Sequence, residues 1–231
     1  ILGVAAWSLS SIASANWDTG ACPQPHEGPA PCIETEINGN TYHFNGSGGH
    51  AGGWYGRPAA EGGGEFDFSG TNLDFECNSV SWGGCNLALS GEVKRCQDSS
   101  GAWRIGVRVT DADMSPGGFA CNFFIADGFP WYLKDPTIAN HCPFEDDCDS
   151  FIPYDPNASA YTASFGAISI SASVIGDLAA EEHMHNVVFT PGVGATFDFT
   201  NKTFFDCDEE EGGCSIDGVL TLDNANSLDI H

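Results

Sequence analysis

Apolar and polar residues alternate along much of this chain, with the two-residue period of a β-strand. In residues 103–109, a tryptophan, an isoleucine and two valines alternate with arginines and a glycine, and in residues 167–174 apolar residues alternate with serines. Because successive side chains of a strand point to opposite faces, each stretch predicts a strand with one buried face. A helical period is scarce, and the only helix candidate is a short one at residues 176–183.

Turn-forming residues separate these apolar runs. The chain has 29 glycines and 12 prolines among 231 residues. A Pro-, Cys- and acid-rich lead-in occupies residues 16–36, and the glycine-rich residues 46–64 are expected to form a long flexible loop. We therefore predict an all-β fold, in which residues 16–231 form a single disulfide-braced antiparallel sandwich or barrel-like domain with long loops.

One sequence pattern occurs twice, at residues 66–91 and 197–222. Each copy begins with Phe-Asp-Phe-Ser or Phe-Asp-Phe-Thr, continues to a cysteine, and reaches Gly-Gly-Cys before a second apolar run. The repeat predicts two related β-hairpin units, each with a broad turn clamped by its own disulfide. Chance similarity between two loops rich in glycine and cysteine is the alternative.

Cysteine is abundant and even in number, with ten residues and no C-x-x-C pair. This favours disulfides formed in an oxidising compartment over a zinc-ribbon or thioredoxin motif. Neighbours along the chain are the preferred partners, which would make every bridge a local clamp. The expected pairs are Cys22–Cys32, Cys77–Cys85, Cys96–Cys121, Cys142–Cys148 and Cys207–Cys214.

The charge is strongly acidic, since seven Lys and Arg residues against 32 Asp and Glu give a formal net charge of −25. Nucleic acids and anionic membrane surfaces are bound by basic surfaces, so neither is an expected partner. Salt or divalent cations would screen the self-repulsion of such a surface. Together with the cysteines, the charge indicates an extracellular or cell-surface protein.

Residues 1–15 are uncharged, mainly apolar, and end in Ala-Ser-Ala. This pattern fits the apolar region and cleavage site of a secretory signal, so one interpretation is an export-signal remnant. The segment is too short for a transmembrane helix, which needs about 20 apolar residues. If it is retained, it has to be buried, and the second interpretation is an assembly strand added to a neighbouring copy.

A histidine pair is the best candidate for a transition-metal site. His183 and His185 alternate around one methionine, so on a strand both imidazoles would point to the same face, as a Zn²⁺ or Cu²⁺ site requires. The spacing does not set a third ligand, which His43 or His50 would have to supply through the fold. A structural or surface role for the pair is the alternative.

Two acidic runs, at residues 145–149 and 206–211, are candidates for weak binding of Ca²⁺, which would be the chain's one cofactor. Carboxylates gathered on disulfide loops would bind the ion and lose their mutual repulsion. Solvated acidic loops are the alternative. The candidate ligands are Asp146, Asp147, Asp149, Asp208 and Glu210.

Catalytic motifs are absent from the sequence, which contains no G-x-S-x-G, H-E-x-x-H or P-loop. Among so many acids, a carboxylate pair by itself does not indicate a glycosidase. Aromatic side chains in loops would suit stacking on surface glycans, and Trp54 and Tyr55 in the glycine-rich loop are the preferred binding residues. Trp82 and the pair Trp131–Tyr132 are further candidates, and core packing is the alternative for all of them.

The order of features in residues 87–131 resembles a known family. An alternating strand ends in Ser90-Gly91, a second strand follows at residues 105–109, and Cys121 precedes Gly128-Phe129-Pro130-Trp131. This order is similar to that of the secreted bacterial PraB family, named as an activator of alkane oxidation. The resemblance implies a β-rich exported protein associated with biofilm or cell-surface filaments. The ten cysteines and the glycine-rich loop depart from the family pattern, and no catalytic residue is carried over.

These observations predict a secreted structural subunit of an extracellular filament, matrix or surface assembly, which polymerises with copies of itself by β-strand addition. Such a subunit needs no active site, so no enzymatic activity is expected. The alternatives are a secreted carbohydrate-binding module and, third, a glycan hydrolase.

Overall fold

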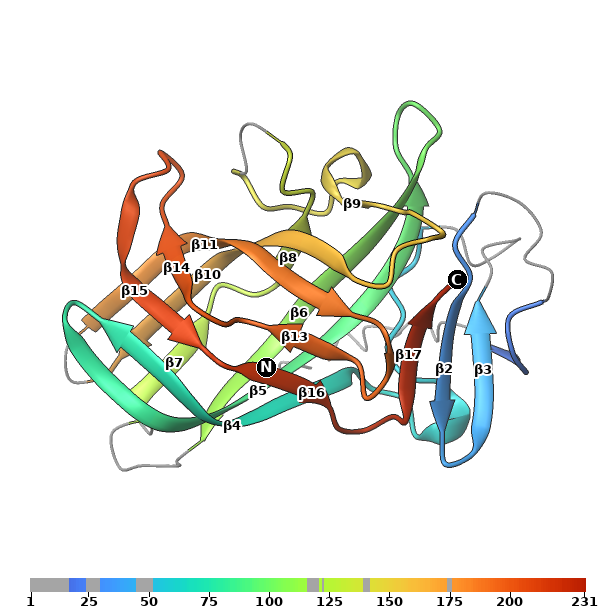
Figure 1. The fold of residues 1–231 in the computed structure, drawn as a ribbon, viewed down its shortest axis with the longest axis horizontal. Coiled ribbons are helices and arrows are strands. Elements are labelled where there is room, and N and C mark those ends of the chain that lie inside the picture. Colours follow the sequence, from blue (N-terminus) through green and yellow to red (C-terminus); the bar gives the residue numbers. More distant parts are fainter. Residues whose placement is uncertain are drawn as a thin grey trace, which may run out of the picture.

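A computed structural model describes residues 17–23, 30–44, 52–115, 121, 123–138, 142–173 and 176–231. Residues 1–15, with their two interpretations, lie outside this range. The described regular structure is antiparallel strand, with short 3₁₀ turns such as Ala59–Glu61 and Cys148–Ser150. In the described part of the chain, no helix is long and apolar enough to cross a membrane. The strands are β1 (Asp18–Thr19), β2 (Ile33–Ile37), β3 (Asn40–Phe44), β4 (Phe66–Cys77), β5 (Val80–Gln97), β6 (Trp103–Ser115), β7 (Phe124–Asp127), β8 (Trp131–Lys134), β9 (Ile152–Pro153), β10 (Tyr161–Ala172), β11 (Gly176–Thr190), β12 (Gly192–Val193), β13 (Thr196–Asp198), β14 (Lys202–Phe205), β15 (Glu211–Asp217), β16 (Val219–Leu222) and β17 (Ser227–Ile230) (Figure 1).

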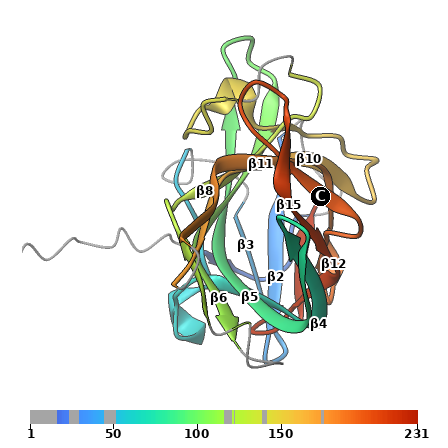
Figure 2. The same cartoon turned by 90° about the vertical axis from the view of Figure 1, so that its left-hand side faces the viewer.

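The larger sheet closes on itself. In the series β4, β5, β6, β8, β10, β11, β14 and β15, each strand pairs antiparallel with the next, and β15 pairs back with β4. A second path, through β13 and β16, also connects β11 to β4. Figure 2 shows these strands wrapping around a common interior. The predicted all-β, barrel-like fold is confirmed.

A smaller sheet, in the order β1-β3-β2-β17-β12, lies at one end of the larger one (Figure 1). The last strand, β17, pairs with β2, so that Ile230 lies opposite Ile33. Strands from the two ends of the described chain therefore meet in one sheet. Its outer strands are β1 and β12, which are two residues long each.

Aromatic side chains fill the interior of the closed sheet, because alternate residues of its strands point inward. Within the described barrel, the remaining space includes two apolar voids of about 20 and 30 Å³. Ligand sites usually have volumes of about 300 Å³ or more, so the interior is a packed core. Its fully buried phenylalanines include Phe66, Phe75, Phe165, Phe189, Phe199 and Phe204.

The alternating stretches form strands, and so does the helix candidate. Residues 103–109 and 167–172 lie in β6 and β10, as predicted. The helix prediction at 176–183 is wrong, since these residues begin β11 and pair with β10. Pairing with a neighbouring strand outweighs a weak local preference. In the glycine-rich segment, the described residues from 52 onward are not all open loop, because Tyr55 forms a β-bridge with Val93.

The disulfide pairing differs from the sequence prediction. Cys22–Cys32 is as expected, but the other four predicted pairs are wrong. Five disulfides indicate an oxidising environment. The observed bridges are Cys22–Cys32, Cys77–Cys214, Cys85–Cys121, Cys96–Cys148 and Cys142–Cys207.

Closure of the barrel explains why Cys77 and Cys214 are bonded to each other and not to their neighbours in the sequence. Cys77 on β4 and Cys214 on β15 are direct register partners at the seam where the last strand of the barrel meets the first. The two repeated segments both form hairpins and lie side by side. The sequence predicted one disulfide inside each unit, but Cys77–Cys214 joins one unit to the other.

Candidate metal centre

Two histidines project together from the outer face of β11. Met184, between them, is 2% exposed and packs in the barrel core. Because neighbouring residues of a strand point to opposite faces, His183 and His185 both point away from that core. Their ring centroids lie 4.7 Å apart, with the ring planes at 90°. The strand thus presents two imidazoles side by side, as the alternation predicts.

The loop between β14 and β15 brings a carboxylate to this pair. The Asp206 side chain accepts hydrogen bonds from the backbone N–H groups of Asp208 and Glu210, at 2.9 Å each. Between them, Glu209 donates its N–H to the Asp206 carbonyl at 3.1 Å and has a φ of 62°. A positive φ is uncommon for a residue other than glycine, and here the surrounding hydrogen bonds impose it. The loop therefore holds Glu209 in a defined orientation.

Two long-range connections fix the position of this loop relative to β11. Phe205, at the end of β14, pairs with His183. Cys207 is bonded to Cys142, which lies two residues before Phe144, the residue whose ring is next to His183. The loop is thus anchored by backbone pairing at its base and by a disulfide within it.

Glu209 completes a cluster of three potential ligands. Its Oε2 lies 2.8 Å from Nε2 of His185, and its Oε1 lies 3.6 Å from Nε2 of His183. One ligand atom from each of the three residues lies within 4.8 Å of the other two. Zinc bonds to nitrogen and oxygen are about 2.0–2.2 Å long, so small movements of these side chains would bring all three ligand atoms within bonding distance of one ion.

The only other such group among the described residues, Cys22, Glu34 and His231, includes a disulfide-bonded cysteine. That sulfur has no thiolate to offer, so this second group is not a metal site.

An aromatic wall covers one side of the cluster. The Phe144 ring lies 5.5 Å from the His183 ring, and His183 is fully buried. Gly166, opposite His183 on β10, makes room for this wall, since a Cβ there would come within 2.4 Å of Phe144. The Glu209 side chain, by contrast, is 44% exposed. An ion would therefore enter from the Glu209 side.

His185 is oriented by its own neighbours. Its Nδ1 lies 3.4 Å from the hydroxyl of Ser164, which is fully buried, and its ring lies 4.8 Å from the ring of Phe205. These contacts direct Nε2 toward Glu209. Partners of the second ring nitrogen commonly set ligand orientation in this way at metal sites.

Other predicted ligands are placed elsewhere. His43 lies on β3 of the smaller sheet, with Nδ1 2.8 Å from the carbonyl oxygen of Gly20, and His50 is outside the described residues. Asp208 and Glu210 flank Glu209 and are exposed, outside the cluster. The sequence offered no criterion for choosing among these consecutive acids, because the choice depends on the pairing of β14 with β11.

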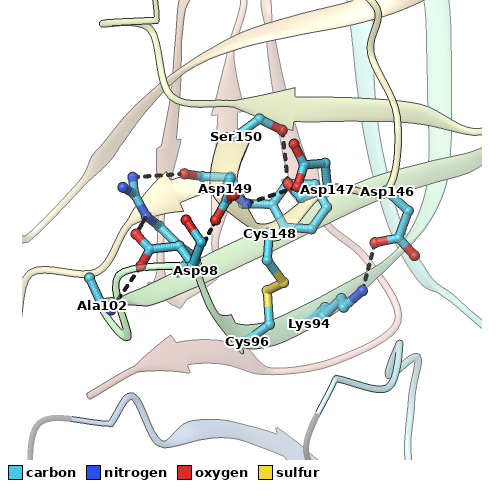
Figure 3. The surroundings of a disulfide bond; sticks show 12 residues. Lys94, Cys96, Asp98, Ala102, Asp146, Asp147, Cys148, Asp149 and Ser150 are labelled. Atoms are coloured by element: carbon cyan, nitrogen blue, oxygen red, sulfur yellow. Dashed lines mark hydrogen bonds and ion pairs between the residues drawn. A yellow bond between two sulfur atoms is a disulfide. The ribbon is translucent and has the colours of Figure 1, made fainter.

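The carboxylates of residues 145–149 do not converge on a common point (Figure 3). Asp146 accepts from the Lys94 ammonium at 2.6 Å and from the Trp54 indole N–H at 2.9 Å. Burial alone would raise the pKa of Asp146, but these two bonds hold it below its ordinary value. Asp147 accepts the N–H of Asp149 at 3.1 Å. Calcium binding by these residues therefore stays a prediction, and Asp146 and Asp147 are engaged in the hydrogen bonds just described.

The preferred glycan-binding aromatics are engaged in packing. Tyr55 is 2% exposed and stacks on Phe44 with ring centroids 4.0 Å apart, so its predicted role as a surface binding residue is wrong. Trp54 is partly buried, and its ring is approached by Arg108 at 4.6 Å and Lys94 at 5.0 Å. The glycine-rich composition suggested an open loop, but this segment lies against β5 and β6.

Comparison with known proteins found no relative: no protein-family model, curated protein or solved structure matches the chain. The function is therefore inferred from the arrangement of the chain's own residues.

Proposed function

We propose that this chain is an extracellular structural protein that binds a divalent transition-metal ion at His183, His185 and Glu209. The observation that carries the proposal is the convergence of two imidazole nitrogens and one carboxylate from two separate elements, β11 and the β14–β15 loop. A bound ion would link the loop between β14 and β15 to β11, a strand of the barrel wall. The five disulfides and the formal charge of −25 support a location outside the cell.

The ligand chemistry favours Zn²⁺ or Cu²⁺ over Ca²⁺. Imidazole nitrogen suits zinc and copper, whereas calcium takes six to eight oxygen ligands. Three protein ligands leave a coordination position for water in a four-coordinate ion. The ligands must lose their protons to bind, so affinity should fall as the pH is lowered.

Titration of metal-stripped protein tests this proposal. Chelated protein is titrated with Zn²⁺, Cu²⁺ and Ca²⁺ in separate calorimetric experiments, and the thermal midpoint is followed in parallel. We expect one Zn²⁺ or Cu²⁺ per chain and a raised midpoint, because an ion that binds only the folded state stabilises it by about 2.7 kcal/mol at a hundred times its Kd.

Glu209→Gln and Glu210→Gln form a matched pair, since both remove one charge from the same loop. We expect Glu209→Gln to weaken Zn²⁺ binding at least tenfold and Glu210→Gln to leave it unchanged. Equal losses in the two variants, or no stoichiometric binding by the unaltered protein, would contradict the proposal.

Self-assembly by strand addition is a second candidate function, favoured by the open edges of the smaller sheet. The larger sheet is closed, whereas β1 and β12 each pair with one strand only among the residues that the structure describes. Strand β1 begins at Asp18, soon after the apolar residues 1–15. An exposed strand edge is a template for pairing with another chain.

Size measurement tests this second candidate. Protein that contains residues 1–231 should form polymers in light scattering at high concentration, and removal of residues 1–15 should leave soluble monomers. A chain that retains residues 1–15 and stays monomeric with bound metal would exclude assembly and leave the metal proposal standing.

A further inference from the structure

The Cys142–Cys207 bridge is the most accessible of the five disulfides. Each of the other four includes at least one buried cysteine, and in three of them both cysteines are buried. In this bridge, by contrast, Cys207 is exposed and Cys142 is half-buried. A disulfide is opened by the attack of a thiolate on one of its sulfurs, so access to the sulfurs limits the rate. A dissolved thiol therefore reaches this bridge more easily than the other four.

Both cysteines of the bridge line a hollow of about 380 Å³, which we call the Cys142 hollow. Two residues of its lining, Ala167 and Glu181, have positive φ angles of 63° and 56° and lie at register shifts between β10 and β11. Bulges of this kind bend a strand locally, and both bulged residues border the space beside the bridge. A thiol of four heavy atoms needs about 120 Å³, at about 30 Å³ for each water-sized group, and therefore fits. The complete described lining is Cys142, Pro143, Phe144, Ala167, Glu181 and Cys207.

The surroundings of the Cys142 hollow are acidic. Glu181 lines it, and its described lining includes no lysine or arginine. Asp206 and Asp208 are the chain neighbours of Cys207. The nearby Lys134 is buried, and its ammonium group donates to a backbone carbonyl. Because like charges repel, a thiol that carries an additional negative group should approach this bridge less readily than one that carries a neutral or positive group.

The same bridge holds the carboxylate ligand of the metal centre. Cys207 lies two residues before Glu209, whose side chain is 44% exposed and is placed by the loop that carries it. Opening the bridge removes one of the two anchors of that loop and leaves the pairing of Phe205 with His183. Neither sulfur of the bridge belongs to the cluster of His183, His185 and Glu209. The freed thiols are therefore not in place to substitute for the carboxylate.

We propose that the Cys142–Cys207 bridge is a thiol-exchange site, at which small neutral or cationic thiols release the metal ion. This inference rests on the proposed metal binding. A thiolate attacks the sulfur of Cys207, the bond between the two cysteine sulfurs breaks, and Cys142 leaves as a thiolate and takes up a proton. A second thiol attacks the mixed disulfide, which frees Cys207 and yields the disulfide of the small molecule. The two thiols thus supply the two electrons and two protons that convert the bridge into two cysteines.

Competition between thiols tests the access and charge arguments. Chelated protein is exposed at low ionic strength to cysteamine, 2-mercaptoethanol or mercaptoethanesulfonate, which carry a cationic, a neutral and an anionic group beside the thiol. Rates are divided by those on an uncharged small disulfide, and freed cysteines are alkylated and located by mass spectrometry. We expect Cys142 and Cys207 to be labelled at least tenfold sooner than Cys96 and Cys148, the matched bridge with one buried cysteine.

The sulfonate should be the slowest of the three reagents, and added salt should narrow the difference, since salt screens exposed charges. Equal labelling of the two bridges would overturn the access argument and the proposal with it. A sulfonate that reacts as fast as cysteamine would overturn the assignment to neutral or cationic thiols.

Titration with Zn²⁺ tests the link between the bridge and the metal centre. Protein opened only at Cys142–Cys207 is capped with methyl methanethiosulfonate, which adds a small neutral group, and is titrated calorimetrically beside untreated protein. We expect the capped protein to bind Zn²⁺ at least tenfold more weakly and to keep the far-ultraviolet circular dichroism of the untreated protein. In Glu209→Gln, capping should change the remaining affinity less than twofold, because the ligand that the bridge positions is already removed.

The outcomes separate this inference from the proposed function. Untreated protein that binds Zn²⁺, together with capped protein that binds it equally well, would overturn the inference alone. Capped protein that unfolds would show that the bridge is a structural staple, which also overturns the inference. Untreated protein that binds no Zn²⁺ would overturn the proposed function and the control of metal release together.

Discussion

Removal of the Cys142–Cys207 bridge should affect both stability and metal binding, whereas removal of Cys77–Cys214 should affect stability alone. These two bridges and Cys96–Cys148 join chain segments 77–96, 142–148 and 207–214 into one closed ring. Breaking any of the three opens the same ring in the unfolded chain. The stability lost through chain entropy should therefore be the same for each, although the bridges lie at different places in the barrel.

The magnitude follows from the length of that ring. Cys77 and Cys214 are 137 residues apart in sequence, but the other two bridges shorten the path between them to about 32 residues. The chain-entropy relation then gives about 4 kcal/mol for either bridge, against about 5 kcal/mol for a lone loop of the full length. Cys77 and Cys214 are fully buried, so alanine at these positions also loses some packing.

The assay compares the double variants Cys142→Ala/Cys207→Ala and Cys77→Ala/Cys214→Ala by urea unfolding and by Zn²⁺ titration. We expect both to lose about 4 kcal/mol of unfolding free energy, with a slightly larger loss for the buried pair. Only the first should lose Zn²⁺ affinity, by tenfold or more, because only that bridge anchors the loop of Glu209. A loss below about 1 kcal/mol in both variants would refute the ring argument, and equal Zn²⁺ losses would refute the anchoring argument.

Three further predictions concern single residues. Arg95→Met should raise the thermal midpoint in calorimetry, because Arg95 is 1% exposed, its Nε has no hydrogen-bond partner in the described structure, and burial lowers its pKa to about 10. We expect the cost of burying this charge to exceed the stabilisation from its Nη1 bond to the Pro31 carbonyl and from its contact with the Trp103 ring. Asp98→Asn should lower stability at pH 7, and urea unfolding should show this difference vanish as the pH falls to about 2, because hydrogen bonds from Ser100 and Arg104 lower the pKa of Asp98 to about 2 and its stabilising effect is lost when it protonates. Gly166→Ala should displace Phe144 from His183, cost about 1–3 kcal/mol, and weaken Zn²⁺ binding; unchanged binding would show that the aromatic wall is dispensable.

The strands of this protein follow from local patterns, and its sheet closure does not. Alternation in residues 103–109 is visible in the sequence because one face of β6 is buried. Local patterns carry no information about which strand lies next to which, and for that reason four of the five predicted cysteine pairs were wrong. Cys77 meets Cys214 only because β15 pairs with β4.

The same limit applies to the candidate site. His183 and His185 lie on one strand, so their alternation is sufficient to bring them together. Glu209 comes from another element and is one of four consecutive acids at 208–211, so only the register between β14 and β11 selects it. Likewise, the glycines around Trp54 favoured an exposed ring, yet its indole bonds Asp146, a residue far along the chain.

The seam between β4 and β15 also sets an order of events during synthesis. A chain that emerges from its N-terminus exposes Cys77 and Cys85 together, long before Cys214 is made. Short loops close faster than long ones, so the neighbouring thiols would be oxidised first and would form the local pairs that the sequence favours. The native bridges then require exchange of those early bonds after the last strand arrives, over seconds to hours. Correct maturation of this protein should therefore depend on a disulfide isomerase in the compartment where it folds.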